Sequence, residues 1–476
     1  MNVLFVVPDT IKMELLSIEL LSACLKRAGH ATRLAYSNHP DFWRRAGAFR
    51  PDLAAFSVTT GMHHGMALLA GDMKRRLPGL LTVFGGPHAT FHPGMIEEYP
   101  GVDALCRGEG EAALVALAGA LQGGRDHSRI PNLWVRAAGG VVRNPLGAPA
   151  ELDGLPFYDR DLFAEADPDL SASTTRAVMV SRGCPYSCSY CYNRGYKALY
   201  GPAAGLARAM SVPRAIAELK RLLLSAPRTR FIEFHDDIFP YSDDERLEEF
   251  ADLYRREIGL EFFTYLPPAR GGRDFIARLK RAGCGFLGIG LECGDEAVRR
   301  EVLRRPRYSN ADVAAAVGAC RELGIRSLTT NLVGLPVADC LRTDLGTLAV
   351  NIAARPTLAL SYLAQPYPGT ELAEIAVRGG FFRAGARIDF NNKADSPLDF
   401  PEGRTAIEKT ALMFGLLLLL PKGWWAFLYL AHRGFKFNVV GRGDYSLGGF
   451  LRELKAFFRY LRTASAEKQL AQAPRI

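Results

Sequence analysis

Residues 181–193 read Ser-Arg-Gly-Cys-Pro-Tyr-Ser-Cys-Ser-Tyr-Cys-Tyr-Asn, and the three cysteines in this run are separated by three and then by two intervening residues. Three thiolates can ligate three of the four irons of a cubane cluster and leave the fourth iron open to a non-protein ligand. Structural zinc is the alternative, but it takes four protein ligands, and no further Cys or His follows nearby. The spacing therefore predicts a reactive 4Fe-4S cluster on Cys184, Cys188 and Cys191.

A series of strand-like and helical segments begins at this motif and continues to about residue 372. The expected strands are residues 176–181, 230–235, 260–266, 286–291, 327–333 and 358–365. Helical patterns such as residues 214–224 and 310–323 lie between several of them. Alternating strands and helices predict an α/β fold with a parallel sheet, in which reactive groups lie at the strand ends.

The N-terminal quarter predicts a separate doubly wound sheet. Its expected strands are residues 3–7, 32–36, 52–58 and 80–84, and a helix over residues 14–27 is closed by Gly29. The ligand of such a sheet lies at the carboxyl ends of its strands. Residues 126–172, which are rich in Gly, Pro and Asp, predict a linker to the following domain.

Together these features resemble the radical S-adenosylmethionine enzymes that carry an N-terminal cobalamin-binding domain, a class B radical methyltransferase-like group. The resemblance rests on the cysteine run and on the later motifs at 236–239, 290–294, 331–336 and 365–370. It implies four regions: a Rossmann-like cobalamin-binding domain (1–125), the linker (126–172), a partial (β/α)6 TIM-type barrel (173–375) and a mainly helical C-terminal region (376–476).

The resemblance also implies the residues that contact each cofactor. Around S-adenosylmethionine, Tyr190 matches the aromatic that packs on adenine, Asp236 and Asp237 offer acceptors for the ammonium group, and Arg270 is placed to hold the carboxylate. Glu292 is expected to accept hydrogen bonds from the ribose, with Asn331 and Gly334 near the adenine. For cobalamin, the expected residues are Ser57, Thr59, Thr60, Gly85, Gly86 and His88.

One loop departs from the cobalamin pattern. Domains that ligate cobalt through histidine carry D-x-H-x-x-G after the first strand, whereas residues 9–14 read Asp-Thr-Ile-Lys-Met-Glu. We therefore expect base-off cobalamin whose lower cobalt face lacks a histidine. A domain that binds nothing and only packs on the core is the alternative. We assign none of His63, His64, His88 and His92 as a metal ligand.

The function that the resemblance implies is cobalamin-dependent methylation of an unactivated carbon in a small-molecule or lipid-like substrate. Radical oxidation, cyclisation or carbon coupling on a tetrapyrrole, hopanoid or lipid is the first alternative, and a non-enzymatic cobalamin or S-adenosylmethionine sensor is the second. The family also needs an electron donor such as flavodoxin or ferredoxin. Cys293 could relay a radical, although a buried cysteine acting as a small hydrophobe is more common.

Composition and termini predict a cytoplasmic protein. Only three of the nine cysteines cluster, which favours a reducing compartment, and the N-terminus has no basic region of a signal peptide. Residues 422–476 hold ten Lys or Arg against three Asp or Glu. With the apolar stretch before them they suit peripheral contact of residues 410–463 with the inner face of a membrane, or else a lid over the barrel. No nucleic-acid motif accompanies this charge, so we expect no nucleic-acid partner.

Overall fold

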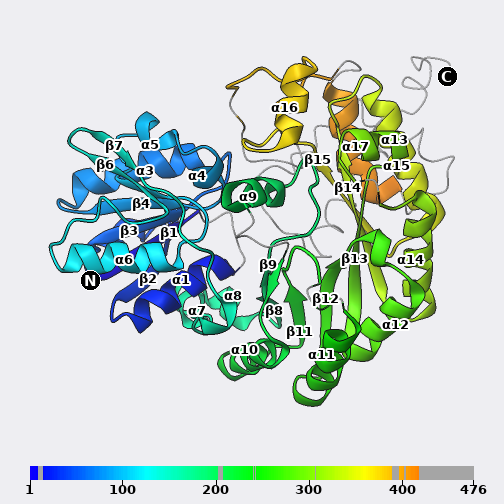
Figure 1. Ribbon diagram of the computed structural model, residues 1–476, viewed down its shortest axis with the longest axis horizontal. Helices are drawn as coiled ribbons and strands as arrows, with labels where there is room; N and C mark the ends of the chain where they lie inside the picture. Colours follow the sequence, from blue (N-terminus) through cyan, green and yellow to red (C-terminus); the bar gives the residue numbers. More distant parts are fainter. Residues whose placement is uncertain are drawn as a thin grey trace, which may run out of the picture.

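The computed structural model describes residues 1–8, 14–201, 207–239, 241, 243–305, 307–386, 388, 396–400 and 404–417. Two sheets organise these residues into an N-terminal and a larger C-terminal domain, which lie side by side in Figure 1. The α/β class, with a sheet at the N-terminus and a parallel half-barrel after it, is the predicted one and is confirmed.

The N-terminal domain is built on a seven-stranded sheet of order β2-β1-β3-β4-β5-β6-β7. Its strands are β1 (Asn2–Val7), β2 (Ala31–Tyr36), β3 (Leu53–Ser57), β4 (Leu81–Gly85), β5 (Ala104–Cys106), β6 (Leu133–Ala137) and β7 (Gly140–Arg143). Its helices are α1 (Leu16–Arg27), α2 (Phe42–Phe49), α3 (His63–Arg76), α4 (Pro87–Phe91), α5 (Met95–Glu98) and α6 (Glu111–Gln122). The first five strands pair in parallel.

Alternation along β1 explains why helices cover both faces of this sheet. Val3, Phe5 and Val7 belong to one buried cluster, and Leu4 and Val6 belong to another. Successive side chains of a strand point to opposite faces, so β1 needs an apolar layer on each side.

The sheet is larger than the sequence predicted, because β6 and β7 fall inside the segment assigned to the linker. They add an antiparallel hairpin to the edge of β5. Only the part after β7 crosses to the next domain, through η1 (Leu152–Gly154), α7 (Asp161–Ala166) and α8 (Pro168–Ala172).

The C-terminal domain is a six-stranded parallel half-barrel of order β15-β14-β13-β12-β11-β8. Its strands are β8 (Thr175–Val178), β11 (Phe231–Phe234), β12 (Glu261–Leu266), β13 (Cys284–Glu292), β14 (Arg326–Val333) and β15 (Leu358–Leu363), with β9 (Ser181–Arg182) and β10 (Arg208–Ala209) forming a small ribbon. Its helices are α9 (Tyr192–Tyr200), α10 (Val212–Ser225), α11 (Asp244–Glu257), η3 (Pro268–Arg270), α12 (Arg273–Ala282), α13 (Glu296–Glu301), α14 (Asn310–Glu322), α15 (Cys340–Ala354), α16 (Glu371–Arg378) and α17 (Arg404–Leu417). All six predicted strands are present.

Buried charges join the two domains where β8 passes the start of α1. The Glu14 carboxylate pairs with Arg176 of β8 and lies 3.5 Å from Arg160 of the connecting segment, and it accepts the Ala177 N–H at 3.4 Å. Glu14, Arg160 and Arg176 are all less than 10% exposed. Breaking a buried ion pair is costly, so this junction fixes how the two sheets meet.

The described part of the C-terminal region packs on the half-barrel. Ile407 and Phe414 of α17 are fully buried, and the Ser361 hydroxyl of β15 donates to the Ala411 carbonyl at 2.7 Å. Thr410, Ala411 and Phe414 therefore lie in the core, at one end of the predicted contact segment. Its remainder, residues 418–463, lies outside the described residues. In the described ranges no helix has the length and apolarity to cross a membrane.

Candidate active site between the two sheets

The three motif cysteines lie on the loop between β9 and α9. Cys191 is the N-cap of α9, and its N–H donates to the Cys188 carbonyl at 3.2 Å. The loop is tied to the half-barrel by the Ser189 N–H, which donates to the Leu303 carbonyl at 3.1 Å. The Lys197 ammonium donates to the Ser187 hydroxyl at 2.8 Å from the following turn of α9. Backbone bonds therefore shape the loop.

The arrangement of the three cysteines is compatible with a cubane cluster. Within the residues that the structure describes, no group of three or more His, Cys, Asp or Glu side chains converges closely enough to hold one metal ion. In a cubane each cysteine ligates a different iron, so the sulfurs need not meet at one point. Burial raises the pKa of the Cys184 thiol to about 11, and binding iron must therefore displace its proton.

A cavity of about 760 Å³ lies between the domains. Ser57, Gly85 and Gly108 line it from the ends of the N-terminal strands, while Cys191 and Asp237 line it from the half-barrel. This volume is within the range of cofactor pockets, about 300–1,000 Å³. The structure thus brings the ligand ends of both sheets to one space, which is the arrangement expected of two cofactors that act together.

The wall on the N-terminal side suits a large flat ligand. Gly85, Gly86, Gly108 and Gly110 line the cavity where the strands end, so at these four positions the backbone faces it. Ser57, Gly85 and Gly86 line this cavity, and their contacts with cobalamin remain predictions. The region fits cobalamin on this ground, and the histidine-free loop at residues 9–13 lies outside the described residues.

Three other predicted cobalamin residues do not line the cavity. The Thr60 hydroxyl and His88 Nδ1 are 3.0 Å apart in the interior, and the Thr59 hydroxyl donates to the Met62 sulfur at 3.0 Å. Burial lowers the pKa of His88 to about 3, so its ring is neutral. His88 stacks on His63 with 3.7 Å between ring centroids. Their cobalamin roles remain predictions.

On the half-barrel side, Tyr190 and Glu292 belong to one buried network. Arg305 donates to the Tyr190 hydroxyl at 2.6 Å and lies 3.2 Å from Glu292 Oε1, which also accepts from the Thr330 hydroxyl at 3.1 Å. Glu292 ends β13 at a register shift and has a φ of +60°. A left-handed backbone is costly for glutamate, and such strain is typical of functional sites.

The neighbouring carboxylates Asp236 and Asp237 play different parts. Asp236 is 2% exposed, and its Oδ1 accepts the Val180 N–H at 3.1 Å and the Ser181 hydroxyl. Burial raises the pKa of Asp236 to about 7. Asp237 faces the cavity and accepts the Gly183 N–H at 3.2 Å, at the start of the cysteine loop. Of the two, Asp237 is placed to meet a cofactor, and Asp236 joins β11 to β8.

The remaining predicted contacts lie at the edge of the site. Asn331 is fully buried on the helix-facing side of β14, where its amide donates to the Leu360 carbonyl at 2.9 Å and accepts from Asn351 at 2.8 Å. The Gly334 N–H donates to Asp344 at 3.1 Å. Arg270 ends η3 and is exposed. Their roles toward S-adenosylmethionine stay predictions.

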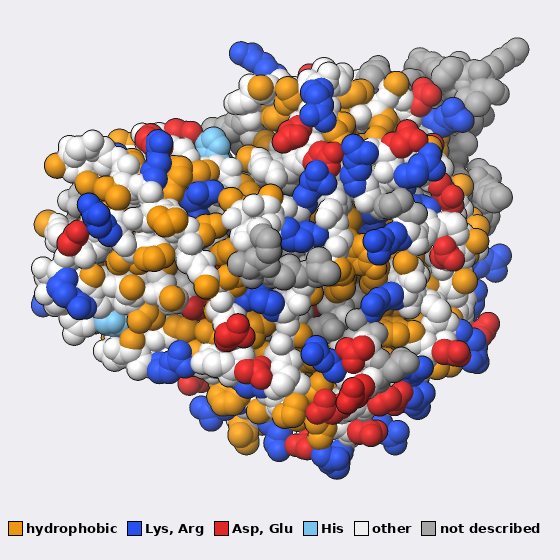
Figure 2. Space-filling view, viewed as in Figure 1, with side chains coloured by type: hydrophobic (Ala, Val, Ile, Leu, Met, Phe, Trp, Pro, Cys, Tyr) orange, Lys and Arg blue, Asp and Glu red, His pale blue; other side chains and the backbone are white. Residues whose placement is uncertain are grey.

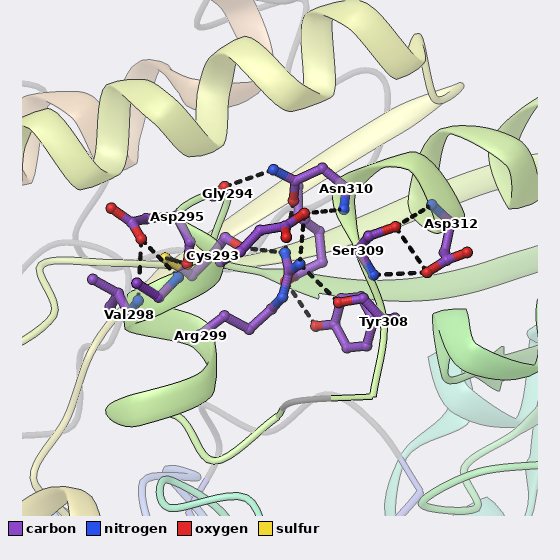
Figure 3. A network of polar contacts seen from close by, with 12 residues as sticks. Cys293, Gly294, Asp295, Val298, Arg299, Tyr308, Ser309, Asn310 and Asp312 are labelled. Carbon is purple, nitrogen blue, oxygen red and sulfur yellow. Dashed lines mark hydrogen bonds and ion pairs between the residues drawn. The ribbon is translucent and has the colours of Figure 1, made fainter.

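Cys293 is part of a structural network rather than of the cavity wall (Figure 3). Its thiol is fully buried 3.6 Å from the Asp295 carbonyl, and burial raises its pKa to about 11. The buried Arg299 guanidinium donates to the carbonyl groups of Cys293 and Tyr308 at 2.8 and 2.9 Å, and to Asn310 Oδ1 at 2.7 Å. The geometry favours Cys293 as a hydrophobe that packs at the end of β13.

Comparison with known proteins gives this geometry a family. The radical SAM superfamily profile matches residues 178–340, and the B12 binding domain profile matches residues 11–118. The chain belongs to the cobalamin-binding radical S-adenosylmethionine enzymes. The cofactors of this family are a 4Fe-4S cluster, S-adenosylmethionine and cobalamin.

Relatives of this radical S-adenosylmethionine enzyme include methyltransferases. The hopanoid C-3 methylase of Methylococcus capsulatus is 29% identical over 76% of this chain and 68% of its own. The uncharacterized methyltransferase PH0819 of Pyrococcus horikoshii is 28% identical over 69% of this chain and 70% of its own. The solved structure of TsrM from Kitasatospora setae with cobalamin and cluster bound has a TM-score of 0.66 at 18% identity, covering 98% of this chain and 99% of that one.

Several residues of the site were not found from the sequence. Arg305 was missed because it follows β13 by more than ten residues and belongs to no quoted motif. Arg182 precedes the first cysteine and pairs with Glu109 at 3.1 Å and with Glu111 at 2.5 Å, across the domain boundary. Glu109 also pairs with Arg208. Residues 107–111 read Arg-Gly-Glu-Gly-Glu and supply both acidic partners, but the sequence alone does not show what they pair with.

Proposed function

We propose that this enzyme transfers a methyl group to an unactivated carbon of a small-molecule or lipid-like substrate. The cavity shared by the cysteine loop and the N-terminal strand ends carries this proposal. When bound, the cluster with S-adenosylmethionine supplies a 5'-deoxyadenosyl radical, and methylcobalamin supplies the methyl group. Both reagents must reach one carbon, which the shared cavity allows.

The protein's own residues position these groups. Cys184, Cys188 and Cys191 would hold the cluster, and Glu292, fixed by Arg305, would accept hydrogen bonds from the ribose. Glu292 is 8% exposed, so its hydrogen bonds form where water competes little. Asp237, beside the cysteine loop, would accept from the ammonium group.

A lipid-like substrate is supported by the long match to the hopanoid C-3 methylase. Cavity-lining side chains on the N-terminal side include apolar ones from α1, namely Leu16, Ile18, Leu20 and Leu21. Apolar walls exclude water from a radical and accept hydrocarbon.

The electron donor would dock at the exposed edge of the cysteine loop. Pro185 and Ser187 are exposed there. Arg194 and Arg304 share the Glu371 carboxylate, with N to O distances of 3.1 and 3.2 Å, and Arg307 lies over the Tyr186 ring. Figure 2 shows basic side chains on the face over α9, α13 and α16, with acidic ones among them. Surplus positive charge near the loop suits an acidic carrier of the flavodoxin or ferredoxin type.

Reconstitution tests the proposed function. The protein is loaded anaerobically with iron, sulfide and hydroxocobalamin and desalted, and iron and cobalt are quantified. We expect one cluster and one cobalamin per chain, and products one methyl group heavier. A Cys188→Ala variant should lose cluster iron and keep cobalt. Cobalt absent from the wild type would overturn the proposal, and loaded protein whose products gain no methyl group would instead indicate radical oxidation, cyclisation or coupling.

Membrane contact and cytoplasmic location remain proposals supported by the sequence alone. Flotation of the full chain with anionic vesicles tests the contact predicted for residues 410–463. Protein that stays in the lipid-free bottom fraction would contradict the proposed membrane contact.

A further inference from the structure

Helix α9 connects the iron–sulfur site directly to the cobalamin domain. Its N-cap is the cluster ligand Cys191, and Figure 1 shows it lying between the two domains. Tyr192, Tyr196 and Tyr200 repeat every four residues along it. Residues with this spacing share one face of a helix, and all three line the interdomain cavity.

Each tyrosine side chain reaches a different loop of the N-terminal sheet. The side chains of Tyr192 and Tyr196 lie beside those of Thr60 and Thr90. The Tyr200 hydroxyl accepts the Glu109 N–H at 2.8 Å. Thr60 follows β3, Thr90 lies in α4 after β4, and Glu109 follows β5. These are neighbouring strands of the sheet, so α9 contacts three successive ligand-binding loops.

Glycines make room for this contact on both sides. A Cβ at Gly108, whose φ is +73°, would collide with the Tyr200 hydroxyl, and one at Gly195 would collide with the Phe91 ring. Phe91, from α4, stacks on Tyr192 with 5.1 Å between centroids and 10° between planes. The two surfaces interlock, because each has lost a side chain where the other inserts a ring.

The hydroxyls of Tyr196 and Tyr200 are protonated at neutral pH. Burial raises the pKa of Tyr196 to about 12, and it raises that of Tyr200 as well. The contacts of these two hydroxyls therefore do not depend on pH between about 5 and 9.

We propose that Tyr192, Tyr196 and Tyr200 are positioning residues that hold the cluster at a fixed distance from the ligand-binding loops of the cobalamin domain. The inference rests on the proposed function, since the distance matters only if both cofactors serve one carbon. Effective catalysis by two groups requires that their separation be held to within about an ångström. Three tyrosines on a helix that starts at a cluster ligand fix that separation directly.

The test is a Tyr196→Phe/Tyr200→Phe double variant, which keeps both rings and leaves Tyr192, next to the cluster ligand, untouched. Tyr254→Phe is the matched control, because the buried Tyr254 hydroxyl has no hydrogen-bond partner among the described residues. Each protein is loaded with cluster and cobalamin. Pulsed electron paramagnetic resonance then measures the dipolar coupling between Co(II) cobalamin and the reduced cluster.

We expect the double variant to retain iron and cobalt but to show a broader distribution of cobalt-to-cluster distances. The two single variants should lie between it and the wild type, and Tyr254→Phe should match the wild type. A double variant whose distribution coincides with the wild type would overturn the proposal, because packing alone would then fix the cofactors.

A second measurement needs no cobalamin and separates this proposal from the proposed function. Hydrogen exchange of the cluster-loaded protein reports the Glu109 amide, whose acceptor is lost in Tyr200→Phe. Loss of one hydrogen bond should speed its exchange by about fivefold. If the wild type retains no cobalamin, the methyl-transfer proposal fails, while unchanged exchange at Glu109 shows that α9 does not hold the loop.

Discussion

Replacing Arg305 with methionine removes the cation that fixes Tyr190 and Glu292 while keeping a side chain of similar length. Its two contacts, at 2.6 and 3.2 Å, lie in a region where both partners of the ion pair are under 15% exposed. Hydrogen bonds to charged groups contribute about 1.5–3 kcal/mol each. Glu292 keeps its hydrogen bond with Thr330. We therefore expect the binding free energy of a ligand that Glu292 contacts to weaken by about 3 kcal/mol.

If Glu292 binds the ribose, that loss weakens S-adenosylmethionine binding by about 150-fold, since each 1.4 kcal/mol is tenfold. Equilibrium dialysis of the cluster-loaded protein measures the affinity, and iron content shows that the cluster is retained. Arg300→Met is the control, because Arg300 is 57% exposed and pairs only with Glu301 among the described residues; its affinity should equal that of the wild type. An Arg305→Met protein that binds S-adenosylmethionine normally would refute the role given to Glu292.

Three further substitutions test other parts of the site. Asp236→Asn should remove a pH dependence of stability. The pKa of Asp236 is raised from 3.8 to about 7, so its contribution to the free energy of unfolding is full below pH 4 and is lost as the pH rises through 7. Denaturant unfolding at pH 5 and pH 8 measures this difference. Gly195→Ala should lower the midpoint of thermal unfolding, because the alanine Cβ would collide with the Phe91 ring. This holds although alanine favours helices over glycine by about 1 kcal/mol. A higher midpoint would show that the two domains move apart to accommodate the methyl group. Cys293→Ala should leave cleavage to 5'-deoxyadenosine unchanged, within twofold, in a chromatographic assay, whereas loss of cleavage with iron retained would restore a radical role for this thiol.

Much of the fold followed from the sequence because strand and helix periods are local. The six strands of the half-barrel and the first four strands of the N-terminal sheet were predicted from apolar runs such as residues 3–7. The hairpin of β6 and β7 was not, because its Gly- and Pro-rich surroundings are also typical of a linker. Local composition does not tell whether such a segment pairs with an existing sheet edge.

The candidate site was likewise predicted from the sequence only in part. Cys184, Cys188 and Cys191 are close in sequence, so their spacing alone predicted the cluster chemistry. The contacts of Arg305 with Tyr190 span 115 residues, and those of Arg182 with Glu111 span 71. Such pairs depend on how distant segments are brought together in the fold, which no local pattern records. Asn331 shows the converse, because its motif is local but its side chain faces the helices.

The interlock of Tyr200 with Gly108 has a consequence for building chimeric enzymes. A natural boundary for exchanging the cobalamin domain between homologues would be the segment after β7, where the chain leaves the first sheet. A graft cut there would bring in new loops after β3, β4 and β5 but keep the host's α9. The Tyr200 ring of α9 would then collide with any side chain that the new loop carries at the position of Gly108. The transplantable module is therefore discontinuous: residues 1–143 together with 192–200.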